Sequence, residues 1–204
     1  MTRTSRGMRI LFAGAALLLL GSGCATVRAS RIRPDYDQYD RQQTKRLVVV
    51  VQPLPDGNAK VGELWATVAR RYVNQKRDFI AKESRAVAGA PVDPRSHCAE
   101  GLEGVLWLTP RMEKKGEGFE ALANGILIRC SDGQEVWSGE AGGSWRSQDP
   151  QLTEVTAVYV SELGPEVEPY VPPTLNLLRP LLDTLPFPEL TTDAEKDEKI
   201  ELGE

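Results

Sequence analysis

Arg46-Leu47-Val48-Val49-Val50-Val51-Gln52, at residues 46–52, holds five consecutive aliphatic residues between two polar ones. A strand with one solvated face alternates apolar and polar residues, whereas a strand covered on both faces reads as a continuous apolar run. Residues 47–51 therefore predict a central strand of a sheet that has packing elements on both of its faces.

A helix and a second strand are predicted to follow this run. Prolines and Gly57 end the first strand, and Asn58 can cap a helix. Residues 79–83 predict a short second strand. Strand, helix and strand of these lengths predict a parallel βαβ crossover. The helix between the two strands is predicted from an apolar stripe at three- and four-residue spacing. The stripe consists of Val61, Leu64, Trp65, Val68, Tyr72 and Val73.

A long antiparallel hairpin is predicted farther along the chain. Residues 105–109 predict one strand, residues 121–130 predict its return strand, and the charged stretch 111–118 predicts the tip. Ser131-Asp132-Gly133-Gln134 is a turn signal. Residues 135–139 then predict a third antiparallel strand.

Helices are predicted to close the domain. Asp149-Pro150 is typical of a helix start, and Gly164 ends an apolar stripe. Pro172-Pro173 opens another helical pattern, which Pro180 is predicted to kink or divide. The two stripes consist of Leu152, Val155, Tyr159 and Leu163, and of Leu175, Leu178, Leu182 and Leu185.

These elements predict an α/β fold. We expect a single mixed β-sheet with a βαβ crossover, a long antiparallel hairpin and C-terminal packing helices, all within residues 46–190. Residues 84–103 are rich in small and turn residues and predict a loosely packed loop with a short helix near its end. The hydrophilic residues 191–204 carry six acids and predict a disordered acidic tail.

Residues 1–23 have the three-part layout of a secretory signal. Three arginines precede an apolar run over residues 10–20, and small residues lead into Cys24. The run is shorter than the roughly 20 residues that a membrane-spanning helix needs. A cysteine at the cleavage position predicts a lipoprotein signal, with acyl chains such as palmitate on Cys24.

Two neighbours of Cys24 qualify this prediction. Lipoprotein signals usually have leucine three positions before the cysteine, where this chain has Gly21. An ordinary cleavage site with a cysteine nearby is therefore the alternative.

Acyl chains on Cys24 would anchor the protein stably to the membrane. Ala25 stands where an aspartate would favour the inner membrane, so we expect an outer-membrane anchor that faces the periplasm.

Residues 24–45 predict a flexible, lipid-anchored tether, because they are polar and have no sustained apolar period. Tyr36 and Tyr39 within this segment leave a second interpretation open. In that interpretation, the segment docks onto the fold or onto a partner.

Charge and cysteine content restrict the class of protein. The chain has a formal net charge of −4, and loss of three signal arginines leaves 22 basic and 29 acidic residues, a net charge of −7. Such a protein has no electrostatic footprint for nucleic acid. In an oxidising compartment Cys98 and Cys130 predict a disulfide, with two free buried thiols as the alternative.

The sequence contains no strong catalytic or metal-binding motif. His97 is the only histidine, and structural zinc needs four protein ligands, so we predict neither a metal site nor a cofactor. The pairs Glu100 with Glu103 and Glu166 with Glu168 could in principle cleave glycosidic bonds. Nothing around these acids suggests a raised pKa, and we predict no enzyme activity.

Exposed aromatic residues offer a possible partner surface. Trp65 and Trp107 lie in apolar stretches and are expected in the core. The predicted partner surface consists of Tyr36, Tyr39, Trp145 and Tyr170.

Two segments carry a resemblance to a known family. They are Glu103-Gly104-Val105-Leu106-Trp107-Leu108 and Asp132-Gly133-Gln134-Glu135-Val136-Trp137-Ser138-Gly139. Their order resembles the α/β domain of penicillin-binding-protein activator lipoproteins and of the TolB amino-terminal domain. At family level the chain resembles an envelope lipoprotein family of myxobacterial type. The resemblance implies a non-catalytic envelope module that binds other proteins.

We therefore expect a non-catalytic, lipid-anchored envelope lipoprotein that acts as an adaptor or assembly factor for an envelope protein. One alternative is a peptidoglycan-active enzyme that uses the carboxylates. Another is a carrier of an apolar ligand beneath the last helices.

Overall fold

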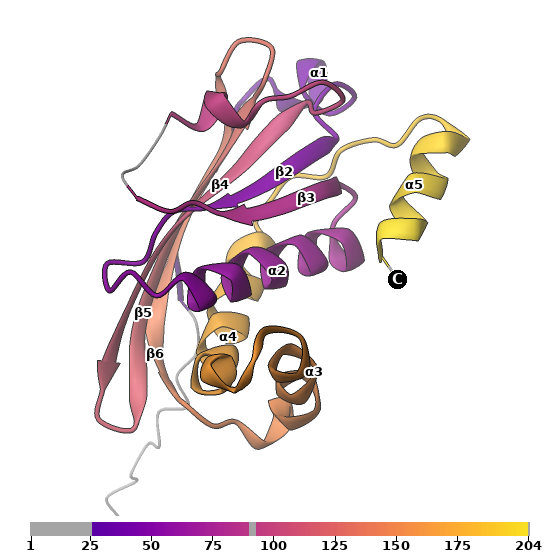
Figure 1. Ribbon diagram of the computed structural model, residues 1–204. Coiled ribbons are helices and arrows are strands. Elements are labelled where there is room, and N and C mark those ends of the chain that lie inside the picture. Colours follow the sequence, from indigo (N-terminus) through magenta and orange to yellow (C-terminus); the bar gives the residue numbers. More distant parts are fainter. Residues whose placement is uncertain (1–25, 90–92, 204) are drawn as a thin grey trace, which may run out of the picture.

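The computed structural model describes residues 26–89 and 93–203. It confirms an α/β fold with one six-stranded mixed sheet in the order β1-β6-β5-β4-β2-β3 (Figure 1). The strands are β1 (Thr26–Ile32), β2 (Arg46–Val51), β3 (Ile80–Ala86), β4 (Gly104–Lys115), β5 (Gly118–Arg129) and β6 (Glu135–Arg146). The helices are α1 (Tyr36–Tyr39), α2 (Ala59–Lys76), α3 (Thr153–Leu163), α4 (Val171–Leu182) and α5 (Asp193–Gly203), with 3-10 helices η1 (Pro94–His97), η2 (Pro150–Leu152) and η3 (Pro165–Tyr170).

Strand β2 lies inside the sheet and is covered on both faces, as its aliphatic run predicts. It pairs in parallel with β3 and with β4. Leu47, Val49 and Val51 belong to the large core under the helices. Val48 and Val50 belong to a smaller core on the opposite face. Because both faces are buried, none of residues 47–51 offers a position at which a polar side chain could reach water.

The predicted crossover through α2 is also confirmed. The Asn58 side chain accepts a hydrogen bond from the Val61 amide at 3.2 Å and caps the helix. The predicted apolar stripe of α2 faces the sheet and belongs to the large core. The second strand begins at Ile80 and extends to Ala86, farther than the predicted residues 79–83.

Strands β4, β5 and β6 form a long antiparallel meander. The β4–β5 pairing runs from Gly104 opposite Arg129 to Lys115 opposite Gly118. The charged residues at the end of β4 are therefore part of the strand, and the turn is shorter than the predicted tip over 111–118. Gly116 makes this turn with a φ of 59°.

Trp137 of β6 fills the centre of the large core. Its side chain is fully buried, and its indole Nε1 donates a hydrogen bond to Thr184 Oγ1 at 3.2 Å. The ring lies over Gly125 and Gly139, where an added Cβ would meet ring carbons at 2.9 and 2.6 Å. These two glycines therefore create the space that the indole occupies.

Helix α4 packs on β5 and β6 on this face of the sheet, and α3 packs against α4, α2 and η3. The Asp149 side chain accepts a hydrogen bond from the Gln151 amide at 3.0 Å, so η2 starts where a helix is predicted, and α3 continues from it. Helix α4 runs through Pro180 to Leu182 as one element, so the predicted division does not occur. Pro180 lies two residues from the end of α4. Within the described residues, no helix is long and apolar enough to cross a membrane.

The predicted tether over residues 24–45 is wrong from Thr26 onward. Residues 26–32 form strand β1, which pairs antiparallel with β6 from Thr26 opposite Gly142 to Ile32 opposite Trp137. Backbone hydrogen bonds to β6 hold this edge strand, so it needs no apolar period. Cys24 and Ala25 lie outside the described residues, as does the predicted signal.

The predicted disordered tail over residues 191–204 is also wrong as far as Gly203, because residues 193–203 form helix α5, while Glu204 lies outside the described residues. Charged contacts, rather than an apolar stripe, attach α5 to the rest of the fold. The buried Glu195 pairs with Lys45 at 2.5 Å. Lys199 donates to the carbonyl oxygens of Val73 and Phe79 at 2.9 and 2.5 Å, and its burial lowers its pKa to about 8.

Replacing Gly139 by valine should destabilise the fold by about 2 to 3 kcal/mol, because the new side chain overlaps Trp137 and Leu181. Urea unfolding followed by circular dichroism measures this loss. Ser144→Val, at an exposed position of the same strand, is the control and should change stability by less than about 0.5 kcal/mol. Equal effects of the two variants would contradict the packing described for Trp137.

The contact of Glu195 predicts a defined pH dependence. Burial opposes ionisation of Glu195, but hydrogen bonds from Lys45 and from the amides of Thr192 and Thr191 outweigh it and lower its pKa to about 2. The stabilisation is therefore complete above the ordinary pKa near 4.5 and is lost as the pH falls toward 2.

Urea unfolding of Glu195→Gln tests this dependence. We expect it to be less stable than the wild type by about 1.5 to 3 kcal/mol at pH 7. The difference should shrink steadily below pH 4.5. Asp197→Asn, at an exposed position of the same helix, is the matched control. A difference that stays constant from pH 7 to pH 3 would contradict this role of Glu195.

Candidate protein-docking site

A disulfide closes the end of the sheet at which β5 ends. Cys98, directly after η1, is bonded to Cys130, directly after β5, with their Cα atoms 5.6 Å apart. This confirms the predicted pairing. The Cys130 amide also donates to the Glu103 carbonyl oxygen at 2.8 Å. The segment before β4 is thereby fixed over the smaller core.

A groove of about 490 Å³ lies beside this disulfide, and we call it the disulfide groove. Its walls come from the segment after α1, the segment before β4 and the β5–β6 turn. Glu100 and Ser131 are exposed at its surface. The full set of lining residues is Gln43, Cys98, Ala99, Glu100, Leu102, Glu103, Arg129, Cys130 and Ser131.

Arg129 fixes the elements around the disulfide groove. Its guanidinium contacts Asp40, which is fully buried, at 2.9 Å and Asp132 at 2.6 Å. The hydrogen bond from Arg129 lowers the pKa of Asp132 to about 2. Arg129 thus ties the end of α1 to the β5–β6 turn. Arg129 was not among the predicted site residues, and its one signal in the sequence is its position three residues before Asp132, at a turn.

A second arginine supports the same end. Arg33 donates hydrogen bonds to the Asp35 carboxylate and to the Gln134 side chain. The hydrogen bond from Arg33 lowers the pKa of Asp35. The chain after β1 is therefore attached to the β5–β6 turn by side chains as well as by the sheet.

The predicted aromatic partner surface does not form one patch. Tyr36 is 5 % exposed, and burial raises its pKa. Trp145 is 8 % exposed, and Tyr170 is half-buried against Phe119, with ring centroids 4.8 Å apart. These three side chains pack within the fold because apolar neighbours cover their rings. Tyr39, at 53 % exposure on α1, is the member of the predicted set that faces solvent.

The carboxylate pairs have unequal surroundings. Glu103 accepts hydrogen bonds from the amides of Lys45 and Arg46 at 2.6 and 2.9 Å. It therefore holds the start of β2. Glu100 is exposed in the disulfide groove, and both Glu166 and Glu168 are exposed on η3. The absence of enzyme activity stays a prediction.

Residues that could bind a metal are not gathered together in the part of the chain that the structure describes. No group of three or more His, Cys, Asp and Glu side chains is found in residues 26–89 and 93–203. His97 lies against Trp107, with ring centroids 5.6 Å apart, and burial lowers its pKa. Its position beside the disulfide indicates a packing role.

Comparisons with known proteins find only distant structural neighbours. No protein-family model and no curated protein matches this chain. A PelC dodecamer structure from Paraburkholderia phytofirmans has 16 % identity and a TM-score of 0.45, with 82 % of this chain and 99 % of that chain covered. Lipoprotein GNA1162 from Neisseria meningitidis has 18 % identity and a TM-score of 0.35, with 58 % and 96 % covered. Similarities at this level carry no functional argument.

Removal of the disulfide should destabilise the domain. The bond joins residues 32 positions apart, which corresponds to roughly 3 to 4 kcal/mol on the chain-entropy estimate. We expect this loss for the Cys98→Ala/Cys130→Ala double variant in urea unfolding. Alkylation of the wild-type protein without reductant should leave both cysteines unlabelled. Labelling of both would contradict the disulfide.

Proposed function

We propose that the protein is a non-catalytic, lipid-anchored envelope lipoprotein whose disulfide groove and Tyr39 receive an envelope protein partner. The proposal includes anchoring at Cys24 in the outer membrane, with the domain facing the periplasm. One observation supports it above all: β1 begins at Thr26, two residues after Cys24, and leads directly to α1 at the groove.

The direction of β1 separates the anchor from the docking site. The strand has seven residues, which span about 20 Å. Beyond it the Arg33 amide donates to the Val136 carbonyl oxygen at 2.9 Å, which keeps the chain at the end of the sheet. Helix α1 and the β4–β5 turn accordingly lie at opposite ends of the sheet (Figure 1). A membrane anchor at the start of β1 would thus leave the groove accessible from the periplasm.

The end of the sheet that carries the disulfide groove has the properties of a docking surface. Tyrosine is enriched among the residues that dominate binding energy at protein interfaces, and Tyr39 is half-exposed there. The disulfide and the contacts of Arg129 and Arg33 hold the surrounding segments in place. A rigid surface loses less conformational entropy on binding than a mobile one.

The two alternative functions have less support from the geometry. Glu103, one member of a predicted carboxylate pair, is engaged with two backbone amides. Beneath α4 an apolar ligand would compete with Leu177, Leu178 and Leu181, which are fully buried in the large core. A groove of about 490 Å³ beside α3 leaves room for a ligand only at the surface of these helices. We therefore retain docking as the proposed function.

Photo-crosslinking in cells tests the docking site. A benzoylphenylalanine probe at Tyr39 or Ser131 should give a discrete protein adduct, whereas a probe at Val158, which is 47 % exposed on α3, should not. The adduct should disappear in Cys24→Ala, which we expect to fold normally and leave the membrane fraction. Adducts from Val158 alone, or none from either groove position, would contradict docking at this end.

Two further outcomes would contradict other parts of the proposal. Persistence of Cys24→Ala in the membrane fraction would overturn anchoring through this residue. Release of peptidoglycan fragments by the purified protein, abolished by Glu100→Ala, would show catalysis instead.

A further inference from the structure

Phe187 is an exposed aromatic residue that the fold holds in a fixed position. Its side chain is 55 % exposed, whereas Pro186 and Pro188 on either side of it are buried. A proline fixes its own φ at about −65° and restricts the residue before it, so the backbone around Phe187 has little freedom. The segment after α4 therefore presents one large apolar side chain to solvent from a rigid support.

A buried arginine holds the ring of Phe187. The guanidinium carbon of Arg77 lies 3.8 Å from the centre of the ring, and Arg77 is 6 % exposed. The guanidinium also donates a hydrogen bond to the Leu185 carbonyl oxygen. Within residues 26–89 and 93–203, no carboxylate forms an ion pair with Arg77. Rotation of Phe187 would take the aromatic partner from a buried cation, which is costly, so the ring is fixed before any partner binds.

Phe187 lies beside the segment that carries Tyr39 and leads into the disulfide groove. The Glu189 amide donates to the Arg41 carbonyl oxygen at 2.7 Å. Phe187 precedes the donor by two residues, and Tyr39 precedes the acceptor by two residues. Farther along the chain, Gln43 lines the disulfide groove. The two exposed aromatic residues therefore flank one strip of the surface that continues into the groove.

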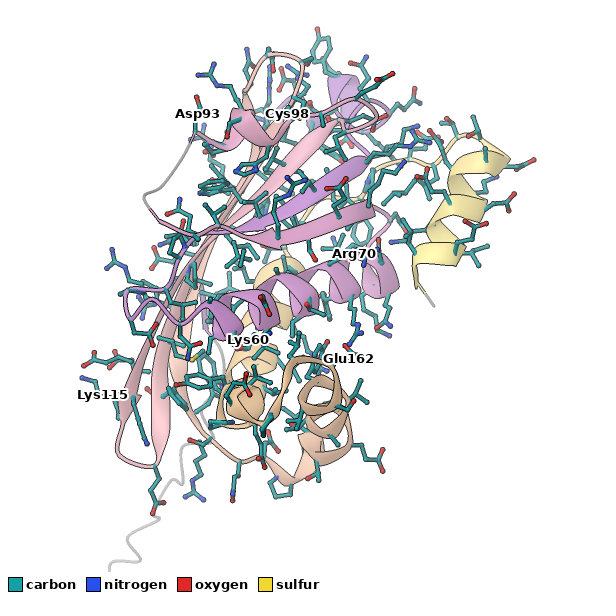
Figure 2. All side chains as sticks on the ribbon, viewed as in Figure 1. Lys60, Arg70, Asp93, Cys98, Lys115 and Glu162 are labelled. Carbon is teal, nitrogen blue, oxygen red and sulfur yellow. A yellow bond between two sulfur atoms is a disulfide. The ribbon has the colours of Figure 1, made fainter. Side chains whose placement is uncertain are left out.

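The segments around this strip carry more carboxylates than basic side chains, nine against six. These segments are residues 33–46, 93–103, 129–135 and 187–189. Each of the six basic side chains contacts a carboxylate, in the pairs Arg33–Asp35, Arg41–Asp37, Lys45–Glu195, Arg46–Glu103, Arg95–Asp93 and Arg129–Asp40. Glu100 and Glu135 are exposed and have no ion-pair partner among the described residues. Figure 2 shows Asp93 and Cys98 at this end of the sheet and Lys115 at the opposite end.

We propose that Phe187, Tyr39 and the disulfide groove form one docking surface, whose partner has an apolar pocket for Phe187 and a lysine or arginine opposite Glu100. The inference rests on the proposed docking function and adds the chemistry of the partner. Aromatic side chains are enriched at the centres of protein interfaces, and a ring that is already fixed loses little entropy on binding. The unpaired carboxylates attract a basic partner and repel an acidic one.

A second copy of this chain does not match these requirements. Without its predicted signal, the chain has a net charge of −7, and the same acidic surface on two copies would repel. The basic side chains of the surface are already engaged in ion pairs within one copy. The occupant is therefore a different protein with a basic binding surface.

Photo-crosslinking in cells that produce the full chain tests the surface at Phe187. Benzoylphenylalanine at position 187 keeps a phenyl ring that can lie on Arg77, so this probe preserves the fixed geometry. We expect it to crosslink the same protein as the probe at Ser131, and mass spectrometry of both adducts identifies that protein. The probe at Val158, which is 47 % exposed on α3, is the control and should give at least about five times less of this adduct.

Removal of the ring tests the anchor from the opposite direction. Phe187→Ala should lower the adduct from the Ser131 probe about five-fold or more, because the partner loses a buried aromatic contact. Val158→Ala, at the exposed position on α3, is the matched control and should change this adduct less than about two-fold.

Charge variants test the basic residue of the partner. Glu100→Lys should lower the adduct from position 187 about five-fold or more, because it places like charges opposite each other in the interface. Glu154→Lys makes the same change at an exposed position of α3 and should alter the adduct less than about two-fold. Near-ultraviolet circular dichroism of the purified variants checks that they are folded.

Each contrary outcome contradicts a defined step. An adduct from Ser131 without one from position 187 would overturn this inference and leave the proposed docking at the groove intact. An adduct with a second copy of this chain, or one that survives Glu100→Lys, would show that the occupant is not a basic partner protein. Absence of adducts from both Tyr39 and Ser131 would overturn the proposed docking function and this inference with it.

Discussion

Backbone pairing of β1 with β6 joins the first described residues of the chain to the sheet. β1 adds to the sheet edge from Thr26 to Ile32, so the domain begins two residues after the predicted lipid attachment site. Without this pairing, residues 26–32 would be a flexible link and the groove could face any direction. With it, the proposed anchor and the proposed docking site lie at opposite ends of one rigid sheet.

The two faces of the sheet support this arrangement differently. One face carries the large core, in which Trp137 packs over Gly125 and Gly139 beneath α4. The other face carries a smaller core that the Cys98–Cys130 disulfide covers at the groove end. Because β6 contributes Trp137 and also pairs with β1, loosening the large core should also loosen the edge strand. Stability of the fold and the proposed orientation of the domain are therefore linked.

The elements that could be predicted from sequence are those with an apolar period or a strong local signal. They include the aliphatic strand at 47–51, the α2 stripe after Asn58 and the disulfide between Cys98 and Cys130. Strand β1 and helix α5 could not be predicted in this way. An edge strand is held by backbone hydrogen bonds, and α5 is held by ion pairs to distant residues, so neither leaves an apolar period. The disulfide groove could not be predicted either, because its walls come from separate segments of the sequence that meet only after folding.

Hydrogen exchange of β1 amides in the mature protein tests the central claim most directly. The claim is that the chain enters the sheet at Thr26, immediately after the proposed anchor. The account predicts that the β1 amides that are bonded to β6 are protected as strongly as their partners on β6, since both belong to one ladder. Exchange of residues 27–32 at the rate of an unstructured peptide, with β6 still protected, would contradict it and restore a flexible tether.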